Sequence, residues 1–222
     1  MLPLSLFNFH TMDVNYTREE EKANALSHGL GILIGILGGG YLLYVAIESG
    51  NTWAIGGMSL YLFGMLSSYV SSTLYHASHP SPRKKMLRKW DHASIYLHIA
   101  GSYSPITLVT LREVGYWGWS IFIFVWLCAI VGVILSFHKL KAHSHLKTIC
   151  YVAMAFSIFV AFKPLLEIVP SNFIYWLIAE GVCYVTGAVF YSFYKLPYMH
   201  TIFHLFVLGG SICHLMVLWY VV

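Results

Sequence analysis

Long apolar stretches, separated by short polar ones, dominate the sequence. Seven such stretches follow one another, at residues 25–47, 53–76, 91–111, 116–137, 146–166, 172–193 and 199–222. A helix of about 20 apolar residues is long enough to cross the hydrocarbon core of a bilayer. Because each stretch reaches that length, the pattern predicts an all-α protein with seven transmembrane helices, placed in the cell membrane as a multi-pass protein.

Composition supports a membrane protein and argues against a soluble one. The chain of 222 residues is 58% hydrophobic and only 10% charged, whereas soluble domains are about 25% charged. Its net charge of +4 is small, so nucleic acid is not an expected partner. The four cysteines lie inside apolar stretches without CxxC spacing, which predicts free, packed thiols rather than disulfides. These cysteines are Cys128, Cys150, Cys183 and Cys213.

The polar segment before the first apolar stretch predicts the start of a helix. Thr17 and Glu20 have the spacing of a capping box, in which each side chain bonds the backbone N–H of the other residue. We therefore divide the chain into an N-terminal cytoplasmic tail, residues 1–19, and a seven-helix transmembrane domain, residues 20–222. The first residues show no features of a signal peptide, and Met12 is an alternative start.

Basic residues predict the orientation of the chain in the membrane. With the N-terminus in the cytoplasm, eleven of the 13 Lys and Arg residues lie on the cytoplasmic side, and two, Arg112 and Lys163, lie outside. The positive-inside rule selects this orientation, and an odd number of helices then places the C-terminus outside. Five of the basic residues fall in Arg83–Lys89. We expect this segment to be a cytoplasmic loop that contacts membrane lipids through their anionic head groups.

Four side chains suited to a metal site fall at the cytoplasmic ends of the predicted helices. His200 and His204 lie four residues apart on one face of the seventh helix, which places their Cβ atoms about 5–6 Å apart. His76 ends the second helix and Asp91 begins the third, so the predicted topology brings both to the same membrane face. Three imidazoles with one position left for water are a known zinc arrangement. The sequence therefore predicts Zn²⁺ held by His76, His200 and His204.

Such an arrangement is typical of a hydrolytic zinc site. Zinc lowers the pKa of a bound water toward neutrality and so supplies a nucleophile. The motif lacks the glutamate of HExxH, because position 201 is Thr, and Asp91 is our candidate for the general base. Ser72, one helical turn before His76, is a second candidate catalytic residue, which would orient a ligand or donate to a developing oxyanion. The alternative is that the histidines only pack between helices.

Four motifs, in this order along the chain, resemble those of the hemolysin III family of bacterial membrane proteins. They are Glu20-Glu21-x-x-Asn24 with Ser27-His28-Gly29, Ser71-Ser72-Thr73-Leu74-Tyr75-His76, Trp90-Asp91-His92-Ala93-Ser94-Ile95-Tyr96 and His200-Thr201-Ile202-Phe203-His204. That family belongs with the adiponectin and progestin receptors (PAQR) and the alkaline ceramidases. The resemblance implies seven helices and a zinc ion near the cytoplasmic side. It also implies that His76, His200 and His204 are the ligands and that Asp91 holds the bound water.

Three further polar residues lie inside the predicted helices. His214 is about 15 Å along the seventh helix from His204, and we expect it to have a buried, hydrogen-bonded role. His28 is an additional side chain that could approach the metal and close the site. At position 180, members of the hemolysin III family usually carry a small apolar residue, whereas this chain has Glu180. The sequence offers this carboxylate no obvious side chain to pair with.

Three functions remain open from the sequence. The first is a zinc-dependent hydrolase of a lipid amide or ester, ceramidase-like and linked to membrane lipid homeostasis. The second is a receptor-like or regulatory membrane protein in which zinc is structural. The third is a pore-forming haemolysin that causes cytolysis, although the sequence shows no ring of charges that would line a pore. Release of fatty acid from a ceramide-like lipid, and a water ligand on the zinc, distinguish the first function from the others.

Overall fold

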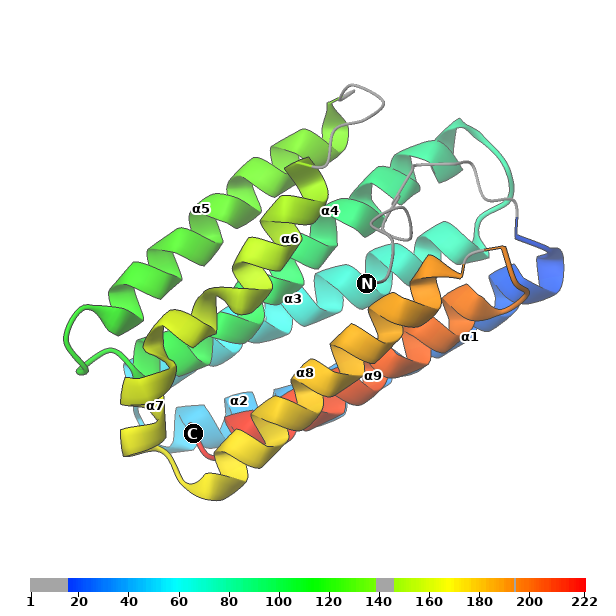
Figure 1. The fold of residues 1–222 in the computed structure, drawn as a ribbon. Coiled ribbons are helices and arrows are strands. Elements are labelled where there is room, and N and C mark those ends of the chain that lie inside the picture. Colours follow the sequence, from blue (N-terminus) through cyan, green and yellow to red (C-terminus); the bar gives the residue numbers. More distant parts are fainter. Residues whose placement is uncertain (1–15, 139–145, 194) are drawn as a thin grey trace.

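A computed structural model describes residues 16–138, 146–193 and 195–222, with side chains described from Cys150 onward in the second range. All secondary structure in these ranges is helical, and the helices lie side by side along a common direction (Figure 1). The first part of the predicted tail, residues 1–15, and the polar segment 139–145 between two apolar stretches lie outside the described residues.

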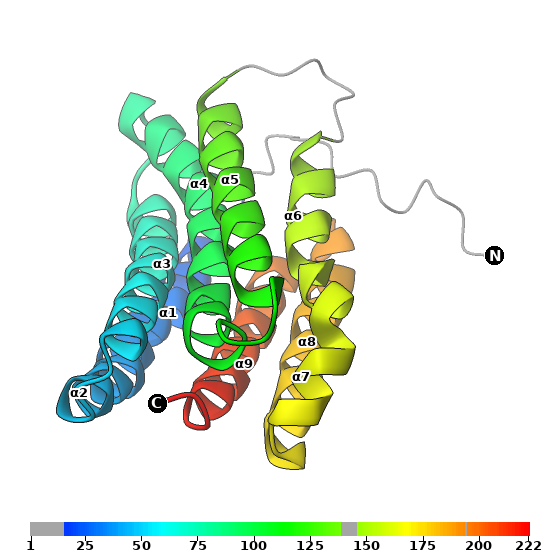
Figure 2. The same ribbon diagram turned by 90° about the vertical axis from the view of Figure 1, so that its left-hand side faces the viewer.

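The helices form successive rods, several of which change helix type along their length. In chain order they are α1 Arg18–Ile34, η2 Gly35–Gly39 and α2 Gly40–Glu48; α3 Thr52–Ala77; α4 Pro82–Pro105 and η3 Ile106–Thr110; α5 Trp117–Phe137; α6 Leu146–Phe156, η4 Ser157–Ala161 and α7 Phe162–Ile168; α8 Ser171–Ser192; and α9 Met199–Leu218. The start of α1, the end of α3 and the start of α9 share one end of the bundle (Figures 1 and 2).

The predicted capping box at the first helix is confirmed. The Glu20 backbone N–H donates to Oγ1 of Thr17, and the Thr17 backbone N–H donates to the Glu20 carboxylate at 2.9 Å. The Glu20 carboxylate also accepts the backbone N–H of Tyr198 at 2.9 Å. Tyr198 immediately precedes α9 and has a positive φ of 60°. One carboxylate thus fixes the start of α1 against the start of α9.

Gly64, Ser68, Ser72 and His76 follow one another at helical spacing in the sequence, and this stripe of small and polar residues is buried along α3. It packs mainly against α4, and the two backbones approach each other closely at glycines. A Cβ on Gly64 would meet the carbonyl oxygen of Leu97, and a Cβ on Gly101 would lie 2.8 Å from the carbonyl oxygen of Leu60. Because small residues let the helices touch, the serine and histidine side chains between them point into the bundle.

The third helix begins earlier than the sequence predicts. Ser81 caps it by accepting the backbone N–H of Lys84 at 3.2 Å, and Pro82 occupies its first turn, a position that tolerates the missing N–H. The prediction that Arg83–Lys89 is a loop is therefore wrong, because this basic segment forms the first turns of α4. Asp91 consequently lies in the third turn of the helix and does not begin it.

Two prolines coincide with changes of helix type. Pro105 ends α4, and the π-helical segment η3 follows it. Pro164 lies in the first turn of α7, and the preceding turn is the 3₁₀ segment η4. Since proline has no N–H and its ring clashes with the carbonyl four residues earlier, regular α-helix is interrupted at both places.

Among the described residues, five helical rods are long and apolar enough to cross a membrane. They are Arg18–Glu48, Trp117–Phe137, Cys150–Ile168, Ser171–Ser192 and Met199–Leu218. The rods of α3 and α4 are not among them. These two helices bury many of their serine, tyrosine and histidine side chains against each other and against α1 and α9. The four cysteines are free, as predicted.

Candidate metal centre

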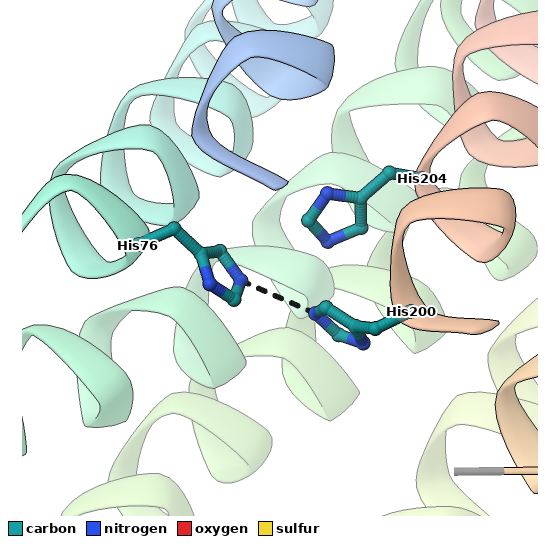
Figure 3. A group of neighbouring side chains, drawn as sticks. All are labelled: His76, His200 and His204. Atoms are coloured by element: carbon teal, nitrogen blue, oxygen red, sulfur yellow. Dashed lines mark hydrogen bonds between the residues drawn. The ribbon is translucent and has the colours of Figure 1, made fainter. Parts of the chain in front are cut away.

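Three imidazoles from two helices meet near one end of the bundle, and we call them the histidine centre (Figure 3). His76 comes from the last turn of α3, and His200 and His204 come from the first turns of α9. Nε2 of His76 lies 3.2 Å from Nε2 of His200. One ligand nitrogen from each of the three rings lies within 4.8 Å of the other two. The structure therefore brings the three predicted ligands together.

The donor set fits a metal ion. At a tetrahedral zinc with Zn–N bonds of about 2.0–2.1 Å, ligand nitrogens are about 3.3 Å apart, close to the 3.2 Å between His76 and His200. The Nδ1 atom of His200 is buried without a hydrogen-bond partner within the described part of the chain. Three neutral nitrogen donors, with no carboxylate in the group, could hold a metal ion among these residues.

Glu21 orients the ring of His76. The Nδ1–H of His76 donates to Oε2 of Glu21 at 2.6 Å, and Nζ of Lys84 donates to the other carboxylate oxygen at 2.7 Å. Because the carboxylate can only accept, it fixes the imidazole proton on Nδ1 and leaves the Nε2 lone pair facing His200. Hydrogen bonds of this kind, from the far nitrogen of a ligand imidazole to a carboxylate, are usual at metal sites and raise ligand basicity.

His204 is oriented by neutral groups of α1. Its Nδ1–H donates to Oγ of Ser27 at 3.1 Å and to the carbonyl oxygen of Asn24 at 3.3 Å. Oγ of Ser27 itself donates to the same carbonyl at 2.9 Å, so its lone pairs remain available to the imidazole. The proton of His204 is again fixed on Nδ1, and Nε2 is left as the donor atom.

Two aromatic rings cover the histidine centre. His28 stacks on His204 with 3.4 Å between ring centroids, yet it is not part of the ligand group. Tyr16, just before α1, stacks on His200 at 5.0 Å. Burial raises the pKa of the Tyr16 phenol above its usual value, so the hydroxyl remains protonated and neutral beside the centre. The centre is thus closed from the side of the N-terminal segment by an uncharged ring.

The two predicted catalytic residues occupy the surroundings of the centre. Ser72 is buried one turn before His76, and its hydroxyl has no hydrogen-bond partner among the described residues. The Asp91 carboxylate lies outside the group of ligand atoms. It is within electrostatic range of Tyr75 and Tyr191, whose rings lie 4.6 Å from His76 and 5.6 Å from His200, respectively.

Sequence reasoning missed the orienting residues of α1. In the sequence, Glu21 belongs to the Glu20-Glu21-x-x-Asn24 motif. Glu21, Asn24 and His28 also have the i, i+3, i+7 spacing of one helix face, and this spacing could have identified them. This face turns toward the histidine centre and provides three of its contacts: the Glu21 carboxylate on His76, the Asn24 carbonyl on His204, and the His28 ring on His204. Asn24 also accepts the hydroxyl of Thr201 at 2.5 Å, which ties α1 to α9 between the two ligands.

Comparison with known proteins agrees with these motifs. The sequence profile of the family described as "Haemolysin-III related" matches residues 16–215. The chain is 39% identical to "Hemolysin-3" of Bacillus cereus over 87% of each chain. It is 35% identical to the "Hemolysin-3 homolog" of Bacillus subtilis (strain 168), over 88% of this chain and 91% of that one. It is also 28% identical to the human "Monocyte to macrophage differentiation factor", over 90% of this chain and 83% of the relative.

The family match covers α1 to α8 and α9 as far as Leu215, including the residues of the histidine centre. The matches to the Bacillus relatives cover 87% and 88% of this chain. Together with the apolar helices that are long enough to cross a bilayer, these findings confirm the resemblance seen in the motifs: the chain is a multi-pass membrane protein that belongs to the haemolysin-III-related family.

Proposed function

We propose that this protein is a zinc-dependent hydrolase of a lipid amide or ester. The observation that carries the proposal is that three imidazoles converge on one point. In two of them, His76 and His204, groups of α1 accept the Nδ1 proton, so that Nε2 is free to bind a metal. When bound, zinc would lower the pKa of a water and act as a Lewis acid on an acyl carbonyl. His200 and His204 lie on a rod that is long and apolar enough to cross a membrane, so an acyl chain could approach them from the lipid.

The protein's own groups would perform the proton transfers. Asp91 would accept the proton of the attacking water and return it to the leaving amine or alkoxide, so that water and amide become carboxylic acid and amine. The unpartnered Ser72 hydroxyl would donate to the carbonyl oxygen as its negative charge develops. His76, His200 and His204 would remain neutral ligands throughout.

The proposal includes seven membrane spans with a cytoplasmic N-terminus and an outside C-terminus. It counts the rods of α3 and α4 as spans, because apolar rods lie beside them in the bundle and several of their serine and histidine side chains are buried. The exposed Arg83, Lys85 and Lys89 at the start of α4 would then contact anionic head groups of the cytoplasmic leaflet. A reporter fused to the C-terminus should report the outside, and one inserted after Ser81 the inside. The opposite pair of signals would reject this orientation.

The test of the activity uses purified protein loaded with zinc. We expect it to release fatty acid from a ceramide-like lipid in mixed micelles, and we expect the His200→Ala protein to release none. Wild-type protein that holds zinc at one ion per chain but releases no acid from amide or ester lipids would contradict the hydrolase.

A structural zinc is the second candidate, and a specific observation favours it. Tyr16 and His28 cover the histidine centre with stacked rings, and the ion would join α3 to α9. In this case zinc would stabilise a receptor-like or regulatory membrane protein without catalysis. A protein side chain as the fourth zinc ligand would support this candidate, whereas a water as the fourth ligand would support the hydrolase.

A further inference from the structure

Apart from the histidine centre, a pair of ionisable side chains lies buried in the bundle. Nδ1 of His214, on α9, lies 2.8 Å from Oε2 of Glu180, on α8. Glu180 is 9% exposed and His214 is 2% exposed. At a rise of 1.5 Å per residue, His214 lies about 15 Å along α9 from His204. Ionisable groups inside a membrane-spanning bundle are costly, and they usually mark a pathway or a binding site.

The surroundings of this pair offer hydroxyl groups rather than opposite charges. Tyr61 of α3 lies 5.1 Å from the His214 ring, and its hydroxyl is buried without a partner among the described residues. Nε2 of His214 is unpartnered within the same residues. Other titratable groups facing Glu180 from the packed helices are Tyr103 of α4, Tyr184 of α8 and Cys213 of α9. His98 of α4 faces His214.

A column of exchangeable polar groups lies between the pair and the histidine centre, beginning with Tyr184, which is within electrostatic range of Glu180. The hydroxyl of Ser211 lies 3.5 Å from that of Tyr184 and 2.7 Å from that of Tyr69. The Tyr69 ring meets His28 edge-on at 5.1 Å, and His28 stacks on His204. Buried polar atoms without protein partners are usually satisfied by internal water. With such waters, the hydroxyls and imidazoles would form a chain along which a proton can move.

Three buried apolar side chains lie toward the other end of the bundle from the pair. Met58 lies one turn before Tyr61 on α3, Leu218 one turn after His214 on α9, and Phe173 seven residues before Glu180 on α8. All three are 0% exposed and belong to one hydrophobic core cluster. These side chains offer no exchangeable hydrogen, so they close the far side of the pair.

We propose that Glu180 and His214 form a proton-binding site in the middle of the membrane that fills and empties only from the side of the histidine centre. One proton enters through the hydroxyls of Tyr69 and Ser211, each of which accepts one proton and passes one on. The pair then holds it as a neutral carboxyl group beside a neutral imidazole. The proposal is independent of hydrolysis and of zinc.

A proton suits this site better than a metal ion or a lipid group. The carboxylate is already bonded by an imidazole, and the Tyr61 ring packs 5.1 Å from the His214 ring. The group of metal-competent side chains found among the described residues includes neither Glu180 nor His214. A proton needs no further ligands and no open volume.

The first experiment measures protonation of Glu180 by pH-difference infrared spectroscopy of the purified protein in detergent. Wild-type protein should show a carboxylic-acid carbonyl band that depends on pH and disappears in Glu180→Gln. Glu167→Gln, which changes an exposed glutamate of α7, is the matched control and should keep the band. His214→Phe retains the carboxyl group and should shift the pH midpoint of the band, which provides a second test if Glu180→Gln does not fold. The proposal would be overturned if the intensity of the band in wild type did not change with pH, or if the band persisted in Glu180→Gln.

The second experiment tests the route. After a rapid pH jump, the band should respond about tenfold more slowly in Ser211→Ala than in wild type, which corresponds to about 1.4 kcal/mol on the barrier. Tyr69→Phe should act in the same direction, whereas Ser59→Ala, at an exposed serine of α3, should not. Equal rates in Ser211→Ala and wild type would show that the proton does not move through the column. In sealed vesicles under a pH gradient, wild-type protein should carry no sustained proton flux, and a steady flux would overturn the closed side.

Discussion

The histidine centre and the Glu180–His214 pair are both buried and ionisable, but they are built in different ways. In the histidine centre, donor nitrogens face one another and no carboxylate stands between them. In the inner pair, an imidazole is already bonded to a carboxylate at 2.8 Å. Lone pairs that face one another are stabilised by a cation placed between them, whereas a paired carboxylate and imidazole need only a proton. The arrangement of partners, more than burial, separates a candidate metal site from a candidate proton site.

The largest effect should come from removing a ligand. His76→Ala, His200→Ala and His204→Ala should each reduce zinc content steeply, because two imidazoles do not complete a stable tetrahedral site. His98→Ala and His214→Ala, which remove buried histidines outside the centre, should retain zinc. The measurement is metal content per chain in purified protein. Zinc-free wild-type protein, or equal occupancy in the His76 and His214 variants, would remove the distinction between the two regions.

The same variants should differ in thermal stability when zinc is added. A ligand at 100 times its dissociation constant stabilises the native state by about 2.7 kcal/mol. Wild type should therefore unfold at a higher temperature with zinc than with a chelator, and His76→Ala should show little difference. The Glu180→Gln protein should respond to zinc as wild type does, because its substitution lies in the other region.

Asp91→Asn should separate catalysis from metal binding. An asparagine can still hold a water but cannot take its proton, so hydrolysis should fall by about 10²–10⁴-fold while zinc content stays at the wild-type value. The readout is fatty-acid release together with metal analysis of the same sample. Loss of zinc in Asp91→Asn would instead make Asp91 a ligand, and the three-histidine site would need revision.

Glu21 gives an intermediate effect. Glu21→Ala removes the carboxylate that fixes the His76 proton on Nδ1, and groups in this position typically change metal affinity by about 10–100-fold. Glu21→Gln retains an acceptor oxygen and should lose less. Glu19→Gln is the control, since Glu19 is exposed and pairs with Lys22 on the outer face of α1. Zinc titration with a competing chelator measures all three proteins, and equal affinities in Glu21→Ala and Glu19→Gln would show that Glu21 does not support the site.

Local spacing in the sequence predicted the parts of the molecule that depend on one helix at a time. The Thr17–Glu20 capping box, the buried stripe ending at His76, and the shared face of His200 and His204 each follow from helical periodicity within one segment. The spacing also predicted that these two histidines and His76 meet, because the topology placed their helix ends on one side.

Contacts between helices could not be predicted in the same way. Glu21 and His76 are 55 residues apart, and Glu180 and His214 are 34 apart. Their pairing depends on how each helix is rotated and shifted against its neighbour, and periodicity leaves both quantities open. The sequence therefore left Glu180 without a partner, and it showed Arg83–Lys89 as a basic interruption where Ser81 in fact starts a helix.

The smallest effect on zinc affinity should come from Ser27. Its comparison with Ser211 tests whether the histidine centre and the Glu180–His214 pair are separate. Ser27→Ala removes one neutral hydrogen bond to Nδ1 of His204 but leaves the Asn24 carbonyl, which accepts the same proton at 3.3 Å. A neutral hydrogen bond contributes about 0.5–1.5 kcal/mol, so zinc affinity should fall only a few-fold, less than in Glu21→Ala. Ser211→Ala removes a buried serine of the inner column and should leave zinc affinity unchanged while slowing the response of Glu180 to pH. Ser211→Ala could instead lower zinc affinity as much as Ser27→Ala does. The two regions would then be one coupled network, and the hydrogen-bond partner of an imidazole would not determine whether that imidazole binds zinc or a proton.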